Sequence, residues 1–109
     1  MIYYKIEIFL PEKYIELMIE RINNLGACKV GNYDYCASYI KVKGCWRPLE
    51  SAAPFKGKKS MINYGEEYKL EIRAPEHLVK EVVKVIKEVH PYEEVLFNII
   101  QLQNHLFDK

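Results

Sequence analysis

An internal repeat limits the fold more than any other feature of this sequence. The stretch KIEIFLPEKYIELMIERINNLG (5–26) aligns without a gap with KLEIRAPEHLVKEVVKVIKEVH (69–90), at an offset of 64 residues. In both copies apolar residues alternate before a proline, Pro11 or Pro75, as they do in a half-buried strand. After the proline they recur every three or four positions, as in an amphipathic helix whose first residue a proline suits well. The chain therefore uses one strand–helix unit twice.

Each predicted helix is followed by a second strand, at 28–42 in the first copy and at 94–102 in the second. The order βαββαβ with right-handed crossovers predicts an α+β, ferredoxin-like fold, in which four antiparallel strands form one sheet with both helices on one face. We expect a single domain over 1–109, with the repeats at 2–42 and 66–102. The stretch 43–65 has neither periodicity and predicts a long loop that serves a function or an interface.

The strand faces predict how the sheet is covered. Even-numbered residues of the first strand and Tyr68, Leu70 and Ile72 should lie under the helices, whereas Lys5, Glu7, Lys69, Glu71 and Arg73 should lie on the open face. The last strand is apolar on both faces, and the second strand carries several tyrosines. Such strands at the edges of a sheet invite pairing with another subunit, so we expect a homo-oligomer.

Composition excludes several classes of function. A formal charge of +1 over 109 residues gives no electrostatic reason to bind nucleic acid or an anionic membrane. The third strand, YGEEYKLEIR, lacks the basic and aromatic consensus of RNA-recognition sheets. No apolar run approaches the ~20 residues that span a bilayer, and the N-terminus lacks the pattern of a secretory signal. We expect a soluble cytoplasmic protein.

The segment HPYEEV (90–95) allows two interpretations. In the first, Pro91 ends the helix, His90 occupies its last turn, and the two glutamates are solvated. In the second, His90 acts with Glu93 or Glu94, either as an acid–base pair or as ligands of a divalent metal ion, and trimer symmetry, or Asp34 and Cys36, supplies the remaining metal ligands. Imidazole and carboxylate suit zinc or copper.

Two further motifs are candidates for ligand binding. GNYDYC (31–36) is either a bend that leads into a strand or one wall of a cleft, with Asn32, Tyr33 and Asp34 facing the ligand. In the loop, Trp46, Arg47 and Phe55 form an aromatic and basic cluster typical of an anchor or a contact surface. Tyr92 completes the predicted ligand-binding set. The lysines around Gly57 match no phosphate-binding loop pattern.

Four motifs together resemble a known family: GNYDYC (31–36), WRPLESAAPFKG (46–57), EEYKLE (66–71) and HPYEEV (90–95). In order and spacing they are similar to small standalone YqfO-type proteins, and to the insert domain of hexameric dinuclear-metal-centre proteins, over nearly all of residues 2–103. The resemblance implies the PII-like or CutA-like variety of the ferredoxin fold, which commonly forms trimers. The two metals of the larger proteins are held by a separate surrounding domain, so their site is not expected here.

The resemblance also implies glycine at two loop positions where this chain has Ser51 and Ser60. Serine adopts positive φ less readily than glycine, which disfavours the turns that the family's loop would have there.

We therefore expect a non-enzymatic, trimer-forming domain that binds a small ligand or a divalent copper or zinc ion, in regulation or metal homeostasis. The chain offers no set of nucleophile, base and orienting group. The alternative is a structural assembly module without any ligand.

Overall fold

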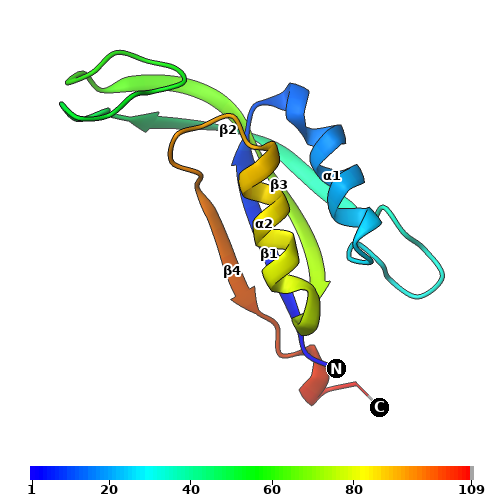
Figure 1. Cartoon of the computed structure of the whole chain (residues 1–109). Helices are drawn as coiled ribbons and strands as arrows, with labels where there is room; N and C mark the ends of the chain where they lie inside the picture. Colours follow the sequence, from blue (N-terminus) through cyan, green and yellow to red (C-terminus); the bar gives the residue numbers. More distant parts are fainter. Residues whose placement is uncertain (109) are drawn as a thin grey trace.

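One antiparallel sheet and two helices organise the chain in the computed structural model, which describes residues 1–108 (Figure 1). The elements follow the order βαββαβ and the sheet has the strand order β2-β3-β1-β4. The strands are β1 (Tyr3–Leu10), β2 (Ala37–Trp46), β3 (Asn63–Pro75) and β4 (Phe97–Gln101). The helices are α1 (Ile15–Asn24) and α2 (Val79–Val89). The predicted α+β, ferredoxin-like fold is confirmed, with β2 and β4 at the edges as expected.

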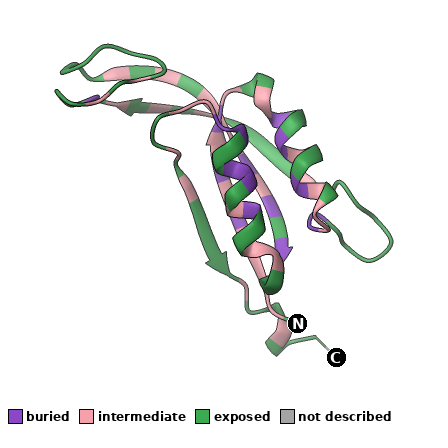
Figure 2. Ribbon diagram, in the orientation of Figure 1, coloured by how far each residue is buried: buried purple, intermediate pink, exposed green. Residues whose placement is uncertain are grey.

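The core lies between the sheet and the helices, as the periodicity predicts. Alternate residues of β1 and β3 are buried under α1 and α2, and the purple stripes in Figure 2 mark this layer. Its largest fully buried side chains are Ile6, Ile8, Leu10, Leu70, Met18, Ile22, Val82 and Ile86. Each contributes about 1.5–3 kcal/mol by leaving water. The open face carries the expected charges, with Lys5 3.2 Å from Glu7 and Lys69 3.6 Å from Glu71.

Both prolines of the repeat lie just outside the helices. Pro11 and Pro75 are extended, with ψ of 150° and 153°, and each precedes a short 3-10 turn, Glu12–Tyr14 or Glu76–Leu78. The α-helices start only after these turns, so the prolines precede helix entry rather than occupy the first α-helical position. The two copies of the repeat keep this detail in common.

The segment 28–36 is not part of β2, contrary to the prediction. Val30 and Tyr33 bond to each other through both backbone groups, which makes a tight hairpin around Gly31, whose φ is +58°. Gly31 and Asn32 are residues that favour such two-residue turns. The apolar residues that suggested a strand here therefore belong to a short hairpin after α1, drawn in cyan in Figure 1.

The loop between the two halves is shorter than the predicted 43–65. Strand β2 continues to Trp46, which pairs with Asn63 at the start of β3, so the loop covers 47–62. The two strands satisfy each other's backbone groups and extend past the end of β1, whose last pair is Leu10 with Tyr68. Strand β4 is likewise shorter than the predicted 94–102. None of the helices in residues 1–108 combines the length and apolarity needed to cross a bilayer.

Candidate ligand site

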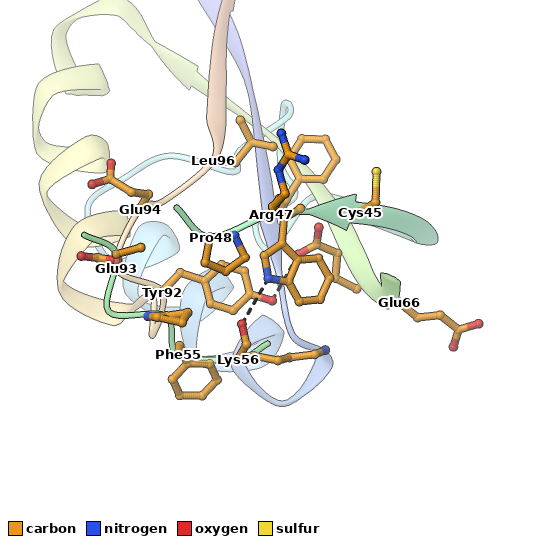
Figure 3. Close-up of a pocket in the computed structure, with 16 residues that line it drawn as sticks. Cys45, Arg47, Pro48, Phe55, Lys56, Glu66, Tyr92, Glu93, Glu94 and Leu96 are labelled. Atoms are coloured by element: carbon orange, nitrogen blue, oxygen red, sulfur yellow. Dashed lines mark hydrogen bonds between the residues drawn. The ribbon is translucent and has the colours of Figure 1, made fainter. Parts of the chain in front are cut away.

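A pocket of about 290 Å³ occupies the space beyond the end of β1 (Figure 3). Three segments enclose it: the paired ends of β2 and β3, the loop 47–62, and the HPYEEV segment on its way from α2 to β4. Its walls combine aromatic, acidic and basic side chains: Phe9, Trp46, Phe55 and Tyr92; Glu66, Glu67, Glu93 and Glu94; and Arg47 and Lys56. Four of the seven predicted ligand-binding residues, Trp46, Arg47, Phe55 and Tyr92, therefore line one pocket.

His90 fixes the path of the HPYEEV segment under this pocket. It caps α2 with extended backbone (ψ 134°) and is only 7% exposed. Its Nε2 contacts the Phe9 carbonyl, and its Nδ1 accepts a hydrogen bond from the Tyr92 amide at 3.2 Å. These two bonds assign the neutral tautomer with the proton on Nε2, which donates to Phe9. Burial lowers the pKa of His90 and outweighs the opposite effects of the Phe9 carbonyl and of Glu67.

Tyr92 forms the floor of the pocket. Its ring meets the His90 ring edge-on, with centroids 4.6 Å apart, and lies 5.8 Å from the Phe55 ring. Its hydroxyl donates to Glu67 Oε1 at 3.3 Å. Burial, and then the negative charge and the hydrogen bond of Glu67, raise the pKa of Tyr92 to about 12. The hydroxyl is therefore protonated at neutral pH and available as a donor.

A hydrogen bond and a cation–π contact hold the loop 47–62 against Trp46. The Trp46 Nε1–H donates to the Lys56 carbonyl at 3.1 Å, and Lys56 Nζ lies 5.6 Å from the centre of the indole ring. A side chain at Gly65 would come within 3.2 Å of the indole, so the missing side chain lets Trp46 lie across β3. The Asn63 side chain exchanges hydrogen bonds with the backbone of Lys58 at 3.1 and 3.0 Å.

The HPYEEV segment is also attached to the loop. Glu93 Oε1 accepts a hydrogen bond from the Ala53 amide at 2.9 Å. Together with the Trp46 and Asn63 contacts, this bond joins the loop motif and the HPYEEV motif in the walls of one pocket.

The GNYDYC motif lies elsewhere. The tip of its hairpin is at the far end of β2, which at about 3.3 Å per residue places it roughly 30 Å from the Trp46 end. Asn23, at the end of α1, holds it: its Oδ1 accepts from the Tyr35 amide at 2.9 Å, and its Nδ2 donates to Asp34 Oδ2 at 3.4 Å. Within one chain, Asn32, Tyr33 and Asp34 therefore do not lie at the pocket, and a ligand surface that joins them to the HPYEEV segment stays a prediction that would need two subunits.

The predicted metal ligands are not assembled within one chain either. Residues 1–108 contain no group of three or more His, Cys, Asp or Glu side chains that could hold a metal ion. Both ring nitrogens of His90 are bonded to backbone, Glu93 binds Ala53, and Cys36 lies with the hairpin, where its Sγ is 3.6 Å from the Asp34 carbonyl. The donor set His90, Glu93, Glu94 and Cys36 therefore does not fit zinc or copper in a single chain.

Several pocket residues were not predicted from the sequence, among them Phe9, Glu66 and Glu67. Glu67 lies within the EEYKLE motif, which carries part of the family resemblance, but the motif gave no reason to assign it to a site. The extension of β3 past β1 is what brings it beside Tyr92.

Comparison with curated proteins identifies relatives of much greater length. A GTP cyclohydrolase 1 type 2 homolog of Staphylococcus epidermidis is 37% identical over 100 residues, which make up 92% of this chain and 27% of that protein. The protein of the same name from Halalkalibacterium halodurans is 34% identical over 101 residues, 93% of this chain and 27% of that protein. The chain thus spans about a quarter of the length of these relatives. A scan against protein-family models finds no match.

Solved structures include a relative of the same kind and other proteins of the same fold. A Bacillus cereus protein related to NIF3 superposes with a TM-score of 0.82 and 27% identity, over 94% of this chain and 26% of that one. The periplasmic divalent cation tolerance protein CutA of Archaeoglobus fulgidus gives 0.70 and 16%, over 93% and 84% of the two chains. GlnK of B. subtilis, in complex with ATP, gives 0.63 and 17%, over 93% and 82%. The last two show the fold alone, and confirm its PII-like and CutA-like form.

Proposed function

Because this chain is homologous to one segment of the YqfO/NIF3-family proteins, we propose that it is a non-enzymatic, trimer-forming regulatory domain that binds a small organic ligand in the pocket beyond β1. The observation that carries the proposal is the pocket itself. Four aromatic side chains and one half-buried carboxylate converge there on about 290 Å³ of space. Ligand sites are typically concave, largely apolar and equipped with few polar groups.

The construction of the walls supports the same proposal. The loop 47–62 is not a loose connection, since Trp46, Asn63 and Glu93 each bind its backbone. A loop held by such hydrogen bonds loses less conformational entropy when a ligand binds beside it. Among proteins of this fold, GlnK is described in complex with ATP, which is consistent with a small molecule as the occupant.

A ligand panel read at Trp46 tests this proposal. The panel comprises metabolites, nucleotides, Cu²⁺ and Zn²⁺, and the two readouts are the melting temperature and the fluorescence of Trp46, the single tryptophan of the chain. A true ligand should raise the melting temperature, by an amount that corresponds to about 2.7 kcal/mol at a hundredfold excess over its Kd. It should also change the Trp46 signal. Phe55→Ala, which removes a half-exposed wall residue, should weaken both effects.

The same panel separates the other outcomes. A compound that stabilises wild type and Phe55→Ala equally, without changing Trp46 fluorescence, binds outside the pocket and contradicts the proposal. For Cu²⁺ and Zn²⁺ the matched variant is His90→Ala, and equal weak binding by both proteins would exclude a specific metal site at His90.

A second candidate function is assembly without a ligand. It is favoured by apolar side chains on both edge strands, with Ile40 60% exposed on β2 and Ile100 41% exposed on β4. An oligomer whose melting temperature responds to no compound of the panel would support this alternative.

A further inference from the structure

Glu67 lies on the part of β3 that has a neighbouring strand on one side only. It pairs with Val42 of β2 on one side, but β1 has already ended at the Leu10–Tyr68 pair on the other. The side chain is half-buried and lines the pocket. A partly desolvated carboxylate needs hydrogen-bond donors or a positive charge, because burial of an unpaired charge is costly.

The chain itself supplies only part of that compensation. The Tyr92 hydroxyl donates to Oε1, which occupies one of about four acceptor positions of a carboxylate. Within residues 1–108, no Lys, Arg or His forms a salt bridge with Glu67.

The two basic residues of the pocket are directed elsewhere. Lys56 Nζ lies over the Trp46 ring, and the Arg47 guanidinium points away from the Tyr92 hydroxyl in Figure 3. Glu67 is thus left with free acceptor capacity toward the pocket.

The other walls specify the rest of the ligand. Trp46, Tyr92 and Phe55 present aromatic rings, which attract flat apolar groups and also cations. Four glutamates against Arg47 and Lys56 make the lining net negative. This balance disfavours a polyphosphate such as the ATP bound by GlnK, because like charges would meet at short range.

We infer that the pocket binds an organic cation, with an ammonium or amidinium group on Glu67 and an aromatic or apolar body between Trp46, Phe55 and Tyr92. This inference rests on the proposed ligand-binding function and narrows it to one chemical class. The charged hydrogen bond to Glu67 provides selectivity, and the aromatic walls provide most of the contact area.

Three probes of one shape and different charge test the inference: 2-phenylethylamine, 2-phenylethanol and phenylacetate. Binding to the full chain is followed by the ¹⁵N–¹H resonance of the Trp46 indole, which is unique in the spectrum because the sequence has one tryptophan. We expect the amine to bind at least about tenfold more tightly than the alcohol, because both can donate a hydrogen bond to Glu67 but only the ammonium adds the attraction of opposite charges. Phenylacetate should bind most weakly.

Glu67→Gln separates the role of the charge from that of the shape. The amide can still accept the Tyr92 hydrogen bond, so the pocket should persist, and the amine should then bind no more tightly than the alcohol. Glu81→Gln, which removes one negative charge from the exposed side of α2, should keep the wild-type preference. A preference for the amine that survives in Glu67→Gln would overturn the inference.

Other outcomes are equally decisive. If the alcohol or the acid binds wild type as tightly as the amine, the cation class is wrong while the pocket remains a ligand site. If none of the three binds, the inference is also overturned. The proposed function then still stands if a compound of the wider panel changes the Trp46 signal, and fails with it if none does.

Discussion

A single histidine, His90, is held at the end of α2 by two backbone groups. From the sequence, His90 fitted both a helix stop and a metal ligand. In the fold its Nε2–H faces the Phe9 carbonyl and its Nδ1 accepts from Tyr92, so neither nitrogen is free. In the internal repeat His90 aligns with Gly26, so the first copy ends its helix without an imidazole. What could not be predicted is that Phe9, 81 positions earlier, offers a carbonyl at the point where α2 ends.

His90 should make the stability of the protein depend on pH in a defined direction. Because burial lowers the pKa of His90 in the folded state, the unfolded chain binds a proton at this residue more readily. The unfolding free energy should therefore fall as the pH drops below about 6.5, the usual histidine pKa, with a limiting slope of about 1.4 kcal/mol per pH unit for one proton. Urea unfolding at pH 7.5 and pH 5.0 measures this loss.

His90→Gln is the variant that isolates the effect. The amide can still donate to the Phe9 carbonyl but does not titrate, so its unfolding free energy should change less between pH 7.5 and pH 5.0. His77→Gln, at an exposed position, should keep the wild-type dependence. The lowered pKa of Glu7 acts below pH 4.5 and thus outside this interval. Parallel curves for wild type and His90→Gln would contradict the prediction.

At the scale of elements, the sequence predicted types better than boundaries. The change of period at each proline identified both strand–helix units, because a strand and a helix bury different sets of positions. The two ends of β2 depend on turn formation and strand pairing. Gly31 and Asn32 form a hairpin before the strand, and pairing between β2 and β3 extends both strands into the region predicted to be a loop. Pairing partners supply backbone hydrogen bonds that hydrophobic periodicity does not reveal.

The loop 47–62 keeps a turn that its composition disfavours. Ser60 has φ of +63°, and its amide donates to the Pro48 carbonyl at 2.7 Å. Ser51, the other position where the family resemblance implies glycine, is absent from the non-glycine residues with positive φ. Ser60 therefore adopts a left-handed backbone conformation, at the expense of strain that glycine would not have.

Replacing these two serines should have opposite effects. Ser60→Gly relieves about 1–2 kcal/mol of left-handed strain and adds less than that in unfolded-state entropy, so we expect it to raise the unfolding free energy by about 0.5 kcal/mol. Ser51→Gly adds only the entropy and should lower the unfolding free energy by about 0.5–1 kcal/mol. Urea unfolding of both variants measures the difference, and an equal loss in both would show that Ser60 is not strained.

At the scale of the whole molecule, the fold followed from the repeat, whereas the pocket did not. The repeat constrains how strands and helices alternate, and right-handed crossovers then leave one sheet order. The pocket depends instead on three segments that meet where β3 extends beyond the end of β1. There the Tyr92 hydroxyl bonds to Glu67, a residue 25 positions earlier in the sequence. Motif lists suggested two of these segments. The same motifs also suggested that the 31–36 hairpin lies near the pocket, but within one chain the length of β2 separates the hairpin from it.

The exposed edges of the sheet predict self-association. The chain is elongated, 52 × 26 × 23 Å, and β4 leaves one side unpaired while presenting Ile99 and Ile100, each 41% exposed. An apolar edge of this kind is stabilised by burial against a second copy. For the trimer that we propose from the family resemblance, light scattering at micromolar concentration should give a mass of about three times the 12.9 kDa of one chain. A wild-type mass near 12.9 kDa would contradict the trimer.

Ile100→Glu should dissociate this oligomer without unfolding the chain. Residue 100 pairs with Lys5 of β1, so a glutamate there finds an opposite charge within the monomer but cannot be buried cheaply against another subunit. We expect a monomeric mass with an unchanged far-ultraviolet circular dichroism spectrum. Leu17→Glu on α1, at a side chain of similar exposure (45%), serves as the control and should keep the wild-type mass. If Ile100→Glu also keeps it, β4 is not at the subunit interface.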